Sequence, residues 1–213
     1  FAGDNGYFLG DNGRFEKMTP HEESVRVPFL VRYPAAIKPG TVVDAPVLNI
    51  DLAPTLYDLA GLKGPEGLDG RSLRPVLASG DAPGWRRDVY LEWQGRQGAV
   101  PPGAPGTVPA PEQATTKKAA AKKAAGAGAV AIPTWRAVRT PTHKYAVYLD
   151  GDLSELYDLR NDPKETKNLI DDPSQKEIVR VLHRRLLELA DETKDPLRPL
   201  IPAGPTTSAT ASR

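Results

Sequence analysis

Apolar residues gather into short runs before residue 95, and again from Trp135 onward. The first long run, residues 25–33, mixes β-branched and aromatic residues and stops at Pro34. It is nearly continuously apolar over residues 27–31, without polar alternation, which is typical of a strand covered on both faces. We therefore predict a buried central strand over residues 25–33.

Two helices are predicted after this strand from apolar residues at helical spacing. The first runs from Asp51 to about Ala60 and stops at Gly61, and the second covers residues 72–78 before Gly80. Asp51 could in principle ligate a metal. We interpret it as the helix cap, because an Asp before a helical run satisfies free backbone N–H groups.

The second apolar block predicts a small antiparallel subdomain. Residues 88–94, 135–140, 144–149 and 155–159 read as four strands, and the last three are separated only by short turns. A helix follows, from a capping box of Ser174 and Glu177 to about residue 190. Its apolar residues lie on one face, which we expect to cover the sheet.

The segment from residue 95 to residue 133 differs sharply in composition. It is rich in Pro, Gly and Ala, with four lysines inside an alanine-rich run. Too few large apolar residues are present to offset the entropy of ordering, so a disordered insertion is predicted. We prefer a tolerated loop to a basic tether for a polyanion. Residues 193–213 are predicted to form a loose tail.

Candidate chemistry lies at the start of the chain, in a glycine-rich polar stretch. Asp4 and Asn5, between Gly3 and Gly6, offer a charged and a neutral oxygen of the kind that hard divalent cations bind. Lys17 offers a point charge to an anion bound on such a cation. Taken alone, Asp-Asn-Gly is also a common turn sequence, and Lys17 could be a solvated surface residue.

The order of these motifs resembles the sulfatases of the alkaline phosphatase superfamily. In that family a strand ends in Asp-Asn-Gly, and a Lys, a Tyr-Glu-Glu-Ser-like segment and Arg-Val-Pro follow. The matching stretches here are Gly3-Asp4-Asn5-Gly6, Lys17, His21-Glu22-Glu23-Ser24, Arg26-Val27-Pro28, Asn49-Ile50-Asp51-Leu52-Ala53-Pro54, Leu68-Asp69-Gly70-Arg71-Ser72 and Glu155-Leu156-Tyr157-Asp158-Leu159. The resemblance covers about the first 90 residues and again residues 135–191. The stretch of residues 49–54 in particular resembles N-acetylglucosamine-6-sulfatase-like members of the family.

This resemblance implies an α/β fold, the C-terminal part of an alkaline-phosphatase-like sulfatase with a small antiparallel sheet plus helix. The implied domains are residues 1–85, from the catalytic domain, and residues 86–94 with 134–192, from the subdomain. It also implies that Asp4 and Asn5 are metal ligands, for Ca²⁺ or alternatively Mg²⁺.

Two further site residues follow from the resemblance. It makes Lys17 a catalytic and substrate-binding residue that contacts the sulfate ester, and it places His21 at a substrate-binding position where the family often has Tyr. Asp11 and Asn12 stand where many members have Glu and His, so no substrate contact is assigned to them.

The family nucleophile is absent from the sequence. Sulfatases carry a formylglycine made from Cys or Ser in a Cys-x-Pro-x-Arg-type motif, whereas this chain has no cysteine and no Ser-x-Pro-x-Arg. We therefore expect this chain to be the C-terminal part of a longer sulfatase and to be inactive by itself. A phosphodiesterase or phosphonate hydrolase of the same superfamily, or a non-catalytic remnant or glycan-binding module, are the alternatives.

The composition limits which classes of binding partner can be expected for this chain. The 28 basic and 27 acidic residues give a net charge of +1, so no global field favours nucleic acid. The sequence contains no run of 18 apolar residues, so no membrane-spanning helix is predicted. The expected partner is a sulfate ester, with a sulfated glycan as the class that the family favours. A secreted or periplasmic location is expected from the resemblance alone.

Overall fold

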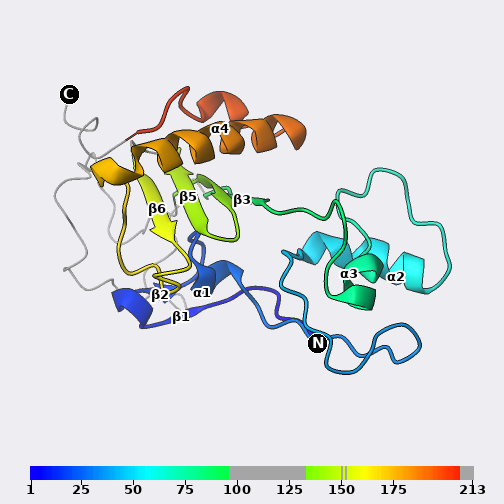
Figure 1. The fold of residues 1–213 in the computed structure, drawn as a ribbon. Coiled ribbons are helices and arrows are strands. Elements are labelled where there is room, and N and C mark those ends of the chain that lie inside the picture. The colour runs from blue at the N-terminus through cyan, green and yellow to red at the C-terminus, as the bar shows by residue number, and fades with distance from the viewer. Residues whose placement is uncertain (96–132, 150, 152, 207–213) are drawn as a thin grey trace, which may run out of the picture. The chain divides into compact units, whose positions relative to one another are not determined.

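The computed structural model describes residues 1–95, 133–149, 151 and 153–206 (Figure 1). The chain divides into two compact units. Unit 1 contains Phe1–Asp4 and Pro28–Val89, and unit 2 contains Asn5–Val27 and Tyr90–Arg213. No helix in the described part of the chain is long and apolar enough to cross a membrane.

Unit 2 is built on a four-stranded sheet of order β3-β4-β5-β6. The strands are β3 (Val89–Trp93), β4 (Trp135–Arg139), β5 (His143–Tyr148) and β6 (Ser154–Asp158). β5 pairs antiparallel with both β4 and β6, so that Tyr145 lies opposite Val138 on one side and Leu156 on the other. The predicted four-stranded sheet is therefore confirmed.

The helix α4 (Lys176–Glu192) covers one face of this sheet (Figure 1). Strand residues and helix residues form one apolar core there, since alternate side chains of a strand share a face. Its buried members are Val138, Tyr145, Val147, Leu156, Ile170, Val179, Leu182, Leu186, Leu189, Ala190 and Ile201. The predicted amphipathic helix is thus confirmed, and its apolar face does cover the sheet.

The start of this helix differs from the prediction. A 3-10 turn, η3 (Pro173–Gln175), precedes α4, and the cap is Asp172, whose carboxylate accepts from the backbone N–H of Ser174 at 2.9 Å. Glu177 pairs with Arg180 on the exposed face instead of reaching back. An Asp two residues upstream competes for the same N–H, and it displaced the predicted capping box.

Residues 5–27 belong to unit 2 and contain β1 (Phe8–Leu9), η1 (Asp11–Gly13), β2 (Phe15–Glu16) and α1 (Glu22–Val25). They contact the sheet on the side that carries Trp135, Ala137 and Ala146, because Val25 packs with these residues. The predicted domains placed this stretch with residues 1–85. The compact units instead group it with the C-terminal sheet, because its contacts with that sheet are formed by side chains far away in the sequence.

The predicted central strand over residues 25–33 is wrong. Val25 ends α1, and the only pairing in this stretch of the described structure is an isolated bridge between Phe29 and Ala2, with Phe1 bonded to Leu30. The side chain of Leu30 is 66 % exposed. A continuous apolar run becomes a central strand only when strands pair on both sides, and among the described residues only the first few pair with this one.

Unit 1 contains η2 (Asn49–Asp51), α2 (Leu52–Leu59) and α3 (Arg74–Ser79). Its small core consists of Leu73, Val76 and Leu77, against which partly buried residues such as Phe29 and Trp85 pack. Both predicted helices are confirmed, although α3 begins two residues later than expected. Gly80 ends α3 with a left-handed φ of 82°, a conformation that glycine adopts without a Cβ penalty.

Asp51 has a structural role, as predicted, but it is not the predicted side-chain cap, because its carboxylate makes no cap hydrogen bond to α2. Its fully buried carboxylate accepts from Leu48 N at 2.8 Å and from Arg71 N at 2.9 Å, and both of its oxygens bind the guanidinium of Arg86. The carboxylate therefore accepts from the residue before the 3-10 turn η2 and forms an ion pair with Arg86, so it joins three segments of unit 1.

Part of the predicted loose tail is packed. Ile201 belongs to the core under α4, and Asp195 is buried against Arg136, with 2.5 Å between Asp195 Oδ2 and Arg136 Nε. The polar composition of residues 193–213 predicted a loose tail. The structure buries Ile201 and Asp195 of this segment, and so few buried residues leave no trace in the composition. Apart from its two terminal residues, the predicted insertion over residues 95–133 lies outside the described residues, as do residues 207–213.

Candidate active site

Two of the predicted site residues lie in direct contact. The ammonium of Lys17 donates to the carboxamide oxygen of Asn5, with 2.7 Å between Nζ and Oδ1. The amide nitrogen of Asn5 donates to the carbonyl of Gly6 at 2.8 Å. That second bond fixes the orientation of the amide, so its oxygen faces the ammonium group.

The β1–β2 hairpin brings these residues together. Phe8 pairs with Glu16 and Leu9 with Phe15, and the buried ring of Phe8 anchors the hairpin in unit 2. The tight connection passes through η1, where Gly10 has a φ of 115°. Because the strands run antiparallel, the residues just before Phe8 and just after Glu16 emerge at the same end.

Asp4 immediately precedes Asn5 and has an exposed side chain. Residues 4 and 5 offer a carboxylate and a carboxamide, which suit Ca²⁺ or Mg²⁺. The contact with Lys17 shows that the oxygen of Asn5 can face a cationic group. Within the residues that the structure describes, no cluster of three or more His, Asp or Glu side chains could hold a metal ion. The pair fits part of a cation site, which would need further ligands.

His21 lies in the interior of unit 2, only 1 % exposed. Its ring contacts the guanidinium of Arg14, stands edge-on to Phe8, and lies 3.3 Å from the hydroxyl of Tyr157. Burial, aided by the charges of Arg14 and Lys144, lowers the pKa of His21 to about 2. These contacts give the neutral imidazole a structural role, and its contact with substrate stays a prediction.

A buried ion-pair network that sequence reasoning missed lies beside this loop. The ammonium of Lys144, on β5, lies 2.8 Å from Glu22 and 2.9 Å from Glu165. Burial by itself raises the pKa of a carboxyl group, but Lys144 and Arg139 outweigh it at Glu22 and lower the pKa there. Nothing in the sequence marked Lys144 as buried, because lysines usually stay exposed.

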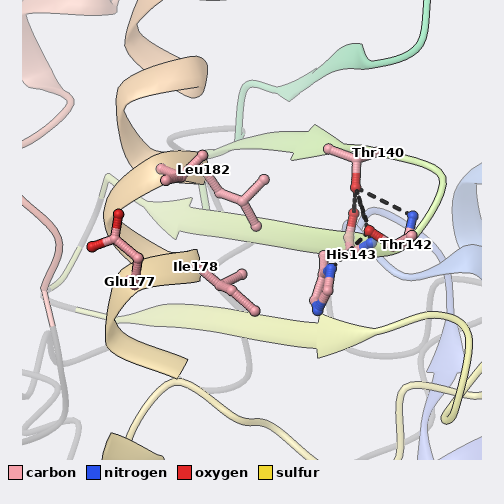
Figure 2. Close-up of a pocket in the computed structure, with 7 residues that line it drawn as sticks. Thr140, Thr142, His143, Glu177, Ile178 and Leu182 are labelled. Atoms are coloured by element: carbon pink, nitrogen blue, oxygen red, sulfur yellow. Dashed lines mark hydrogen bonds between the residues drawn. The ribbon is translucent and has the colours of Figure 1, made fainter. Parts of the chain in front are cut away.

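A surface depression lies elsewhere on unit 2, between α4 and the turn joining β4 to β5 (Figure 2). Its volume is about 330 Å³. The residues lining it are Thr140, Thr142, His143, Glu177, Ile178, Val181 and Leu182. Figure 2 shows the two threonines and His143 hydrogen-bonded to one another at one end. None of the predicted site residues lines this depression.

Comparisons with known proteins agree with the motif order. The family described as N-sulphoglucosamine sulphohydrolase, C-terminal, matches residues 10–99 and 127–192. An N-acetylglucosamine-6-O-sulfatase of Bacteroides thetaiotaomicron is 31 % identical over 202 residues, which is 92 % of this chain and 31 % of that protein. A ulvan-active sulfatase of Formosa agariphila is 30 % identical over 91 % of this chain and 33 % of its own length.

Solved structures agree with the predicted fold class. BT4656, in complex with its substrate D-glucosamine-2-N,6-O-disulfate, matches with a TM-score of 0.72 and 28 % identity, over 92 % of this chain and 34 % of that one. A phosphonate monoester hydrolase from Silicibacter pomeroyi matches with a TM-score of 0.67 and 25 % identity, over 92 % and 35 %. The predicted alkaline-phosphatase-like sulfatase fold is confirmed.

The chain spans about a third of the length of the relatives that it matches. Within that third, the family match begins at residue 10, after Asp4 and Asn5, and covers β2 with Lys17, both helices of unit 1, the sheet β3–β6 and α4. This chain belongs to the N-sulphoglucosamine sulphohydrolase C-terminal family of sulfatases.

Proposed function

We propose that this chain is the C-terminal part of a sulfatase that hydrolyses sulfate esters, with Asp4, Asn5 and Lys17 in its active site. The observation that carries the proposal is the 2.7 Å contact between Lys17 Nζ and Asn5 Oδ1. Asn5 and Lys17 are twelve positions apart in the sequence, and the fold brings them together. The resemblance assigns a cation-binding oxygen to the first and an anion-binding ammonium to the second. Membership in a sulfatase family supports it.

The roles of the three side chains follow from their chemistry. Asp4 and Asn5 would hold Ca²⁺, or alternatively Mg²⁺, as oxygen ligands. The bound cation would polarise the oxygens of the sulfate group. Lys17 would orient the sulfate ester and stabilise the negative charge that develops on the oxygen leaving sulfur. When the cation binds, the ammonium of Lys17 would move from Asn5 toward the sulfate, because two cations repel each other at one oxygen.

The nucleophile must come from residues other than these. The sequence contains neither Cys nor a Ser-x-Pro-x-Arg motif, so the formylglycine that the resemblance implies has no precursor in this chain. A sulfated glycan is the proposed substrate class. It is supported by the glucosamine disulfate bound to BT4656 and by the names of the sulfatase relatives. A secreted or periplasmic location belongs to the same proposal.

A phosphonate hydrolase is the second candidate, because such an enzyme shares the fold over nearly the whole chain. The test is hydrolysis of an aryl sulfate and of an aryl phosphonate by the full-length protein, with Ca²⁺ present. We expect preference for the sulfate. Lys17→Ala should lower kcat/KM by roughly a hundredfold or more, as for other groups that stabilise transition-state charge. Lys63→Ala, at a surface lysine 86 % exposed, should leave it unchanged.

A measurement of Ca²⁺ binding, which needs no catalysis, distinguishes a sulfatase from the third alternative, a non-catalytic remnant or glycan-binding module. Ca²⁺ should raise the melting temperature of the full-length protein, and Asp4→Ala should abolish that rise, since a ligand that binds only the folded state stabilises it. Equal activity of the Lys17→Ala and Lys63→Ala variants would contradict the role of Lys17. No hydrolysis and no Ca²⁺ effect would favour a non-catalytic remnant or glycan-binding module.

A further inference from the structure

The backbone on both sides of Lys17 lies in a costly conformation. Glu16 has a φ of 72° and Met18 a φ of 78°, although neither residue is glycine. Residues with a Cβ avoid this left-handed region, because the Cβ crowds the following carbonyl oxygen. Such a conformation persists only where surrounding contacts hold it, and those contacts can be identified here.

Two buried side chains hold the peptide groups of Met18. The hydroxyl of Ser24, on α1, accepts from Met18 N at 3.0 Å. The indole nitrogen of Trp135, on β4, donates to Met18 O at 2.7 Å. Ser24 is 5 % exposed and Trp135 is 3 % exposed. Both groups are therefore removed from water, which would otherwise compete for the same backbone atoms.

The same serine also holds the other side of the site. The carbonyl oxygen of Ser24 accepts from Gly6 N at 2.9 Å, next to Asn5 in the sequence. A Cβ at Gly6 would lie 2.0 Å from the carbonyl oxygen of Glu23, so only glycine permits this close approach. Ser24 is thus bonded to the residue after Asn5 and to the residue after Lys17.

The helix that carries Ser24 is itself fixed to unit 2. The backbone N–H of Glu22, the first residue of α1, donates to the carboxylate of Glu165 at 2.6 Å. Lys144 pairs with the carboxylates of both Glu22 and Glu165, and Arg139 also pairs with Glu22. The chain of contacts therefore runs from Lys144 on β5 through α1 to Gly6 and Met18, the residues that follow Asn5 and Lys17.

We propose that Ser24 and Trp135 are positioning residues that hold Lys17 and Asn5 in register for sulfate-ester hydrolysis, which rests on the function proposed above. Neither side chain touches the substrate in this proposal. Each side chain acts through the backbone of Met18, whereas the hydrogen bond to Gly6 comes from the backbone carbonyl of Ser24 and does not depend on its side chain. The C-terminal sheet then serves the chemistry directly, because β4 supplies one of the two clamps.

The test is a double-mutant cycle in the full-length protein. Trp135→Phe and Ser24→Ala should each lower kcat/KM for an aryl sulfate by roughly tenfold to a hundredfold, mostly in kcat, because a small misplacement of a catalytic group is costly. In a Lys17→Ala background the same substitutions should cost less than about twofold, since nothing remains to position. Ser24→Thr, which keeps the hydroxyl, should restore most of the activity.

A matched control removes a buried hydrogen bond from the other face of the sheet. Tyr145→Phe breaks the 3.0 Å contact between the Tyr145 hydroxyl and His183, beneath α4. It should change kcat/KM by less than about twofold. Losses that are fully additive in the Lys17→Ala background would show that Ser24 and Trp135 only stabilise the fold, and would overturn the proposal.

Hydrogen exchange gives a readout independent of turnover. The amide of Met18 should exchange at least about tenfold faster in the Ser24→Ala variant than in the parent, and at the parental rate in Tyr145→Phe. Unchanged exchange at Met18 in Ser24→Ala would overturn the clamp even if activity fell. If the parent protein lacks sulfatase activity but Met18 exchanges faster in Ser24→Ala as expected, the proposed function is wrong. The hydrogen bond from Met18 to Ser24 would still be supported.

Discussion

At the scale of single residues, Gly6 is, like Gly70, a position where the tertiary structure leaves no room for a side chain. Its Cα faces the carbonyl of Glu23 so closely that an added Cβ would stand 2.0 Å from the oxygen. The sequence marks Gly6 only as a turn residue beside a polar pair. The packing of α1 against the loop adds a steric reason, which no local pattern contains.

Gly6→Ala should therefore destabilise the protein by about 2 kcal/mol, since backbone at such short range can relieve the overlap only by moving. Thermal denaturation measures the change. Gly204→Ala is the control, because nothing lies within 4 Å of a Cβ at that position. Equal melting temperatures for the two variants would show that the close approach to Glu23 is absent.

His21 makes the stability of the protein depend on pH. Its pKa is about 2 in the folded state and 6.5 as the ordinary value, so below about pH 6.5 the unfolded chain binds a proton that the folded chain refuses. Protonation then favours unfolding, and stability falls as pH falls. Arg14 and Glu155 face the ring, and burial raises the pKa of Glu155, which contributes with the opposite sign.

His21→Gln should remove the histidine contribution and keep that of Glu155. The free energy of unfolding of the parent should fall by up to about 1.4 kcal/mol more per pH unit than that of the variant, between about pH 6 and pH 5. Urea denaturation at several pH values measures both slopes. Parallel slopes for parent and variant would mean that His21 is protonated, or exposed, in the folded protein.

At the scale of elements, α4 is the best-determined feature because its pattern and its packing agree. The apolar positions predicted for one face include Leu186, which is fully buried, although Val181 remains 41 % exposed. The predicted strand over residues 25–33 shows the opposite case. Its apolar run resembles a central strand, yet its pairing partners decide whether it forms.

Leu186→Ala should cost about 3 kcal/mol of unfolding free energy, because it leaves a cavity in the core beneath α4. Val181→Ala on the same helix should change stability much less, since its side chain is partly solvated. Chemical denaturation of both variants measures the difference. Similar losses at the two positions would contradict the packing of α4 on the sheet.

At the scale of the whole molecule, the chain forms two compact units whose segments alternate along the sequence. Unit 1 depends on the Asp51 carboxylate, and unit 2 on the sheet and α4. Because each unit has its own core, a local defect in one should open that unit preferentially.

Asp51→Asn tests this at the buried pair with Arg86. Replacing Asp51 by Asn leaves the guanidinium of Arg86 without its opposite charge and places an amide N–H₂ against other donors, a loss of about 3 kcal/mol. Hydrogen exchange should accelerate in α2 and remain slow in α4. Asp58→Asn, at the exposed pair with Arg74, should change α2 much less. Equal acceleration in α4 would show that the units open together.

The sequence by itself determined the helices, the strands of the small sheet and the order of the site motifs, because spacing, caps and turn residues act over a few positions. Through the resemblance, it also predicted that Asn5 and Lys17 belong to one site. Only the tertiary structure decided that residues 5–27 belong with the C-terminal sheet, that His21 and Lys144 are buried, and that Asp195 and Ile201 fix the tail. Those outcomes depend on contacts between residues far apart in the chain, where burial and charge pairing outweigh local preference.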